Sequence, residues 1–431
     1  DKIGHQNPDR QAGRKGQIDR GEETEPGHDR AEDQQNSESF AATLGHVRHR
    51  AYCEEVGPGI PLPAIVRHRE TAVTAVQNAA LSQTTIAGDR LRPVRIWLYV
   101  MAFMVLCMVM VGGMTRLTGS GLSITTWRPI SGIIPPLTEA DWLAEFAGYR
   151  QIPQYEVYNH WMTLDDFKGI FWWEWIHRFL GRMLGFAFAI PFVVFLFQKR
   201  LTRDMAWPLV GLFLLGGFQG FLGWWMVTSG LSELTSVSQY RLATHLTAAA
   251  LLLLALVWVA RRMRPRPTEG RVTGFHIGST TLLLCMLVLQ IAAGGFVAGI
   301  DAGMGYNTWP LMEGRFIPEG LAAYDPAWRS IFEHGLTVQF NHRMLAYLIT
   351  VVTALLLLLQ VRGAGLSGVH RWLVLIGVLV VAQVALGIAT LLSMIQIDLA
   401  VAHQGLAFVL AASICAYLAD LTKKRSLGAV T

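Results

Sequence analysis

Four of the thirteen histidines lie within long apolar runs, where an ionisable side chain is rare and marks a functional candidate. They are His177, His245, His342 and His403, and each belongs to a different run. A single histidine in a membrane helix can serve only to hydrogen-bond a neighbouring helix. Four at matched positions favour another role, because neutral imidazole is a common metal ligand. The pattern indicates metal ligation by histidines from separate helices.

The elements that must position these histidines are eight apolar runs of about 20 residues, the length that crosses a bilayer as an α-helix. The runs do not alternate in polarity, which favours helices over the strands of a barrel. The sequence therefore predicts an all-α polytopic membrane protein with eight transmembrane helices. They are expected at 96–113, 169–198, 205–227, 242–260, 277–300, 336–361, 372–392 and 400–421.

An internal repeat divides these runs into two sets of four. Residues 111–127, which leave the first run, match residues 293–309, which leave the fifth. An even number of spans per half gives both halves the same orientation in the membrane. We therefore expect two repeated four-helix bundles, an N-terminal half at 93–272 and a C-terminal half at 273–425. Further matched pairs are His177-Arg178 with His342-Arg343, Gln219 with Gln383, Leu222-Gly223 with Leu386-Gly387, and His245 with His403.

The repeat predicts two similar histidine sites. All four histidines lie early in helices that run in the same direction, so they share one level of the membrane. His177 can then face His245, and His342 can face His403. Two imidazoles from opposite helices are the ligands of a six-coordinate heme iron, and four-helix bundles build such sites in their cores. Zinc usually requires more ligands per site.

Glu174 is the one carboxylate well inside an apolar run, and it precedes His177 by three residues on the same helix face. The matching positions of the other half are Val338 and Gln339. Glu174 can pair with a nearby arginine, or it can mark the site at which chemistry occurs. A di-iron centre is excluded, since it needs several carboxylates from different helices.

Three arginines lie close to these histidines. They are Arg178, Arg182 and Arg343. Their guanidinium groups can pair with heme propionates, or they can extend to the membrane interface. The glycine pairs that begin at Gly112 and Gly294 allow close helix packing or a break in the helix. The connections at 114–168 and 301–335 are long and rich in Trp, Gly and Pro, so we expect them to fold as caps.

The formal charge of +5 reflects membrane orientation and not nucleic-acid binding. Lys and Arg concentrate in the segments that face inward if both termini are cytoplasmic. Three of the four cysteines lie within apolar runs and Cys53 lies before them, which leaves no disulfide for an outer loop.

Residues 1–90 are polar and lack apolar periodicity, so we expect a disordered N-terminal tail. They do not resemble a secretory signal. The first methionine is Met101, inside the first run. One explanation is that part of this tail is not native to the protein, and no function is assigned to it.

Several of these motifs together resemble the heme A synthase family, of the alphaproteobacterial and mitochondrial type. The resemblance covers about 93–422. Some relatives have a cysteine pair in an outer loop, and the lack of one here means that no thiol chemistry is expected. The motifs are Gly-Gly-x-Thr-Arg-Leu-Thr-x-Ser-Gly-Leu-Ser at 112–123, Glu174-x-x-His177-Arg178, Asn341-His342-Arg343 and His403-Gln404.

The resemblance implies oxidation of the ring methyl of heme O to the formyl group of heme A, for terminal oxidase biogenesis in the bacterial inner (plasma) membrane. It implies that His342 and His403 hold a resident heme b. It also implies that His177 and His245 hold heme O as substrate, with Glu174 beside the reacting edge. Heme O synthase and an electron carrier are the expected partners besides membrane lipid, and a homo-oligomer is left open.

Two mechanisms and two other functions remain open at this point. An iron with both axial positions filled cannot bind dioxygen. Either one histidine leaves the iron, or the methyl is oxidised by electron removal and takes its oxygen from water guided by Glu174. A diheme b-type cytochrome that only transfers electrons would have the same histidine pairs. A transporter would share the parallel repeats but would bind no heme.

Overall fold

The computed structural model describes residues 90–232, 234–264, 274–361 and 368–422. Within these ranges it contains eight helices long and apolar enough to cross a membrane, which confirms the predicted all-α polytopic fold. The prediction for residues 1–90 falls outside the described residues, Arg90 excepted. The eight helices are α3 (Arg92–Leu117), α5 (Leu164–Phe197), α6 (Arg203–Thr228), α7 (Gln239–Arg262), α8 (Gly274–Gly299), α10 (Gly335–Val361), α11 (Gly368–Leu392) and α12 (Ile397–Leu421).

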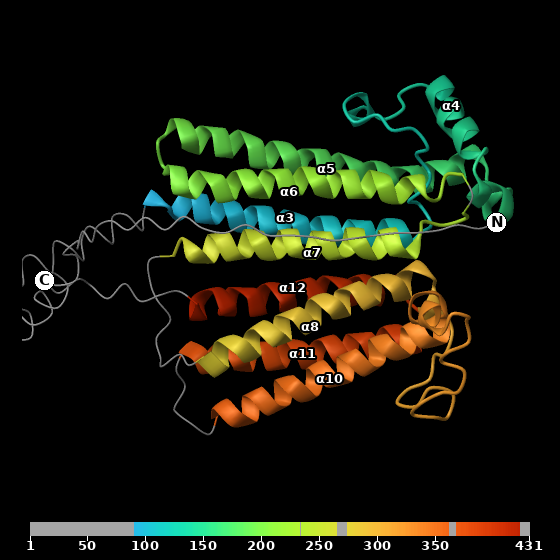
Figure 1. Ribbon diagram of the computed structural model, residues 1–431. Helices are drawn as coiled ribbons and strands as arrows, with labels where there is room; N and C mark the ends of the chain where they lie inside the picture. The colour runs from blue at the N-terminus through green and yellow to red at the C-terminus, as the bar shows by residue number, and fades with distance from the viewer. Residues whose placement is uncertain (1–89, 233, 265–273, 362–367, 423–431) are drawn as a thin grey trace, which may run out of the picture. The chain divides into compact units, whose positions relative to one another are not determined.

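The long helices pack in two rings of four. In the first ring α3 contacts α5, α5 contacts α6, α6 contacts α7, and α7 returns to α3 (Figure 1). In the second ring α8, α10, α11 and α12 make the corresponding contacts. The rings meet where α7 packs on α8 and α12, and where α3 packs on α12. This contact pattern supports the two repeated halves, which stay a prediction of the sequence.

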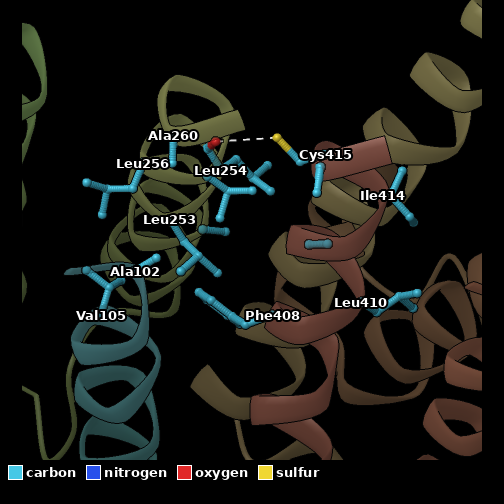
Figure 2. Close-up of a cluster of buried hydrophobic side chains, with 14 of the residues drawn as sticks. Ala102, Val105, Leu253, Leu254, Leu256, Ala260, Phe408, Leu410, Ile414 and Cys415 are labelled. Carbon is cyan, nitrogen blue, oxygen red and sulfur yellow. Dashed lines mark hydrogen bonds between the residues drawn. The ribbon is translucent and has the colours of Figure 1, made fainter. Parts of the chain in front are cut away.

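The largest buried core lies between the two rings. Figure 2 shows side chains of α3, α7 and α12 facing one another, including Val105, Leu253 and Phe408. The Cys415 thiol of α12 donates a 3.3 Å hydrogen bond to the Leu254 carbonyl of α7. Because lipid is as apolar as these side chains, close packing and such hydrogen bonds are what hold membrane helices together.

Small residues bring α3 and α8 close to the opposite ring. A Cβ atom on Gly295 would lie 2.8 Å from the Ala243 Cα atom, so the backbones of α8 and α7 are in contact there. Gly113 faces the Gln404 side chain of α12. Gln404 donates a 2.7 Å hydrogen bond from Nε2 to the Val109 carbonyl of α3. The glycine pairs therefore serve close helix packing, the first of the two predicted roles, and they lie within continuous helices.

The two long connections, 118–163 and 300–334, lie at the same end of the helices, which we call the loop end (Figure 1). The first connection contains α4 (Glu139–Tyr149) and buries its own cluster around Phe146, Tyr149 and Phe167. This confirms a folded cap in the N-terminal half. Helix α5 begins at Leu164, five residues before the predicted start, because Thr163 and Asp166 form a capping box.

Candidate functional site

The four histidines lie at one level, close to the loop end. Each occupies the first half of a helix that begins there: His177 on α5, His245 on α7, His342 on α10 and His403 on α12. At 3.6 residues per turn, all lie within about four turns of the helix start. The common depth expected from the sequence is therefore present in the structure.

Each imidazole packs its edge against a glycine of a neighbouring helix. A side chain on that glycine would collide with the ring or press on it, so only glycine allows the ring to approach the backbone. The sequence reasoning noted these glycines but did not connect them to the histidines. A Cβ atom would lie 2.9 Å from His177 at Gly112, 3.0 Å from His245 at Gly223, 3.3 Å from His342 at Gly294 and 2.8 Å from His403 at Gly387, measured to Cε1 in each case.

Three of the four rings also contact a glutamine placed one turn before that glycine. The pairs are Gln219 with His245, Gln290 with His342 and Gln383 with His403. The amide Nε2 lies 3.1–3.2 Å from Nδ1 of the ring and 3.0 Å from the main-chain carbonyl of the same histidine. The recurring Gln-x-x-x-Gly pattern is visible in the sequence, but the sequence analysis missed Gln290 and gave the other two no role.

The structure brings the histidines together in the expected pairs. His177 is close enough to His245 to interact electrostatically, and His342 is similarly close to His403. His342 and His403 line one mostly apolar cavity of about 300 Å³, together with Gln290 and Gln383. A volume near 300 Å³ is within the usual range for small-molecule pockets.

Glu174 is buried beside the first pair, with 2% of its surface exposed. One carboxylate oxygen accepts hydrogen bonds from Ser123 Oγ at 2.8 Å and from the Ile124 amide at 2.7 Å. The other accepts from Arg178 Nη2 at 2.5 Å. This is the ion pair with a nearby arginine, one of the two roles that the sequence left open for Glu174. A buried carboxylate needs such partners to stay charged. The ion pair does not remove Glu174 from the site, since it lies one turn from His177.

The matching arginines anchor the loop that follows the first helix of each half. Arg178 donates to the carbonyls of Ile124 and Thr126. Arg343 donates to the carbonyls of Tyr306 and Thr308, which are the corresponding residues of the repeat. The sequence did not predict this anchoring, because it depends on where loop carbonyls lie.

The partner of each anchoring arginine differs between the halves. Arg178 pairs with Glu174, whereas Arg343 donates to Gln339 Oε1 at 2.8 Å. The Gln339 amide then donates to the carbonyls of Ala302 and Gly305. The two sites therefore share an arginine and a loop but differ in one charge.

Several cationic groups near the sites have buried atoms without a hydrogen-bond partner among the described residues. These atoms are Arg182 Nη1, Arg343 Nε and Arg116 Nε. Arg182 otherwise donates to the carbonyls of Arg128 and Pro129. Arg116, which the sequence analysis missed, extends from α3 to the wall of the cavity around His342 and pairs with Asp301.

A heme group fits this arrangement on three observations. Each site offers two imidazoles, and the part of the chain that the structure describes contains no group of three or more His, Cys, Asp or Glu side chains suited to an ion. The walls around His342 and His403 are mostly apolar. The Oε1 atoms of Gln219, Gln290 and Gln383 are buried without a partner within the described ranges. A ligating histidine is usually oriented by a polar group at its second ring nitrogen, and each of these glutamines lies at that position.

Fold and site thus define a multi-pass membrane protein with paired histidines buried between its helices. The chain belongs to the cytochrome oxidase assembly protein family, whose sequence model matches residues 95–415.

Relatives of known name cover most of the chain. A heme A synthase from Azorhizobium caulinodans is 51% identical over 327 residues, which are 75% of this chain and 93% of the relative. Heme A synthases from Rhizobium meliloti and Brucella anthropi are each 47% identical, over 78% and 79% of this chain and 92% and 96% of their own lengths. The family predicted from the sequence motifs is confirmed.

Proposed function

We propose that this protein is a heme A synthase, which oxidises the ring methyl of heme O to the formyl group of heme A for terminal oxidase biogenesis. One observation supports the proposal above all: two matched histidine pairs differ by a single buried carboxylate, Glu174 in one half and Gln339 in the other. An electron-transfer protein needs two pairs but no such difference. The names of the relatives agree with the proposal.

Each half has its own task in this proposal. His342 and His403 hold a resident heme b, which supplies one-electron redox chemistry when bound. Arg343 and Arg116 supply positive charge for its propionates, because each has a buried Nε atom free to donate. His177 and His245 hold heme O as substrate, and Arg182 offers its free Nη1 to the carboxylates of that porphyrin.

The residues around Glu174 would hold its carboxylate at the reacting edge. Ser123 and the Ile124 amide hold one oxygen in place, and Arg178 neutralises the charge. A positioned carboxylate can accept a proton from water or from the substrate.

We also infer that the loop end faces the outer side of a bacterial inner membrane and that both termini are cytoplasmic, from the distribution of Lys and Arg. An electron carrier and heme O synthase are the proposed partners.

Conversion of heme O by the purified protein tests the function. We expect detergent-solubilised protein, given heme O and a redox mediator, to yield heme A in extracts separated by chromatography. A protein that retains two hemes but leaves heme O unchanged would instead be a diheme cytochrome. A visible spectrum without a Soret band would favour a transporter and overturn the assignment of both sites.

Gly387→Ala is expected to weaken heme binding in the C-terminal half. The new Cβ atom would lie 2.8 Å from His403 Cε1, so the ring must move away from its position. Loss of a residue that orients a metal-ligating histidine typically lowers metal affinity by about 10–100-fold. Heme content per chain, measured as the pyridine hemochrome, should fall, whereas Gly278→Ala on α8, where a Cβ meets nothing within 4 Å, should retain it. Equal heme contents in the two variants would contradict the glycine's proposed role.

A further inference from the structure

The contacts that support the four rings are alike except at one position on α3. Gln219, Gln290 and Gln383 each stand four residues before the glycine that supports a ring, and each contacts that ring. Before Gly112, the glycine that supports His177, the corresponding residue is Met108. His177 alone of the four therefore lacks a glutamine.

Met108 occupies the place of the glutamine without its hydrogen bonds. Its methyl carbon lies 3.4 Å from the position that a Cβ atom on Gly181 would take, one turn beyond His177 on α5. The side chain thus reaches α5, as Gln290 reaches α10 in the other half. A thioether has no donor and is at most a weak acceptor. His177 Nδ1 is accordingly buried with no hydrogen-bond partner in the described part of the chain.

The glutamines fix both the position and the orientation of their rings. Each amide binds the main-chain carbonyl and the ring of the same histidine, so a rotation of that ring breaks a hydrogen bond. Hydrogen bonds from a neighbouring side chain to a ligating histidine fix the orientation of its ring. His177 has the supporting glycine but not this restraint, so its ring rotates at lower cost and binds a metal less firmly.

We propose that His177 is the exchangeable axial ligand of the substrate site, and that Met108 is the positioning residue that leaves it exchangeable. This inference rests on the proposed function, which assigns heme O to His177 and His245. His245, held by Gln219, keeps the porphyrin in place. Because Glu174 precedes His177 by three residues on the same helix face, the position that His177 vacates is on the side of the buried carboxylate.

The proposal decides between the two mechanisms that the sequence left open. An axial position that opens on demand admits a small molecule to the iron, whereas three firmly held histidines keep the other positions closed. The resident site, with glutamines on both of its histidines, is then restricted to electron transfer. The same fold thereby distinguishes a reactive site from a relay site by this residue of α3 together with Glu174.

Two reciprocal substitutions of similar side-chain size test the proposal. Met108→Gln supplies the missing hydrogen bonds to His177, and Gln290→Met removes them from His342. The probe is carbon monoxide, titrated into the dithionite-reduced protein with its hemes bound and followed by the Soret difference spectrum. We expect carbon monoxide to bind at one of the two hemes of the wild type. Met108→Gln should weaken that binding by about tenfold or more, the scale on which hydrogen-bond partners of metal ligands act. Gln290→Met should open the second heme to carbon monoxide.

Met110→Gln serves as the matched control for the introduced polar group. Met110 lies on α3 two residues from Met108 and faces Gly405 of α12, so its replacement should leave carbon monoxide binding unchanged. Unchanged Soret absorption before titration would show that all three variants fold and hold heme.

The outcomes separate this inference from the proposed function. Protein without heme would overturn the assignment of the histidine pairs themselves. Hemes that are present, but bind carbon monoxide equally in wild type, Met108→Gln and Gln290→Met, would overturn only the role of Met108. Carbon monoxide binding at neither heme of the wild type would show that His177 is held as firmly as the others, and would also overturn it.

Discussion

Glu174→Gln is expected to lower the conversion of heme O by about 10²–10⁴-fold, the usual contribution of a positioned acid or base. Glutamine conserves the size of the side chain but cannot accept a proton. The structure indicates that the fold will tolerate it, because Gln339 occupies the matching position beside Arg343. Heme O should then accumulate unreacted in cells that express the variant, as seen by chromatography of extracted porphyrins. The heme content of the purified protein should be unchanged.

Ser123→Ala distinguishes catalysis from loop anchoring. This variant removes one hydrogen bond to Glu174 but leaves the carboxylate and its ion pair with Arg178 in place. We expect a loss of about 10–100-fold, smaller than that of Glu174→Gln, because a hydrogen bond to a charged group contributes about 1.5–3 kcal/mol. If Glu174→Gln were as active as Ser123→Ala, Glu174 would only anchor the loop through Arg178, and the proposed division between the halves would fail.

His342→Ala is expected to remove the resident heme b and leave the substrate site occupied. The cavity around His342 and His403 would lose one of its two imidazoles, and the remaining one cannot complete a six-coordinate iron. Heme b per chain, measured by pyridine hemochrome, should fall to a small fraction of the wild-type value. The low-spin electron paramagnetic resonance signal of that heme should disappear with it.

Two further variants complete this second experiment. His245→Ala should leave the heme b content close to wild type and reduce heme O binding instead. His334→Ala removes a histidine of the loop end, whose Nδ1 contacts Thr337 Oγ1 at 3.0 Å and which has no proposed metal role. That variant should keep both hemes. Retention of heme b in His342→Ala, or its loss in His245→Ala, would reverse or refute the assignment of the two sites.

The helices and the four histidines could be predicted because both leave a local signal. A run of about 20 apolar residues needs no knowledge of its neighbours to be recognised, and a histidine within it stands out. The start of α5 was placed too late because Asp165, Asp166 and Lys168 lower the hydropathy of its first turns, although the capping box makes them helical. Hydropathy alone does not detect the part of a helix that extends beyond the membrane.

The contacts around each ring could not be predicted with the same ease. Gln290 and His342 are 52 residues apart along the chain, and their contact depends on how α8 turns its face toward α10. Likewise, Arg178 and Arg343 were expected to pair with propionates or to extend to the membrane interface. Their hydrogen bonds to loop carbonyls were not expected, because the positions of those carbonyls follow from the folded cap. For the glutamines and glycines, the repeat offered one signal, which is the recurrence of Gln-x-x-x-Gly.

The hydrogen bond from Gln404 to Val109 connects the two sites through the protein interior. Gln404 follows His403 directly, and Val109 follows Met108, so a chain of covalent bonds and one 2.7 Å contact joins the ligand of one site to the neighbour of the other. In the proposed function, this contact would give electrons a largely bonded route between the relay site and the substrate site within the protein interior.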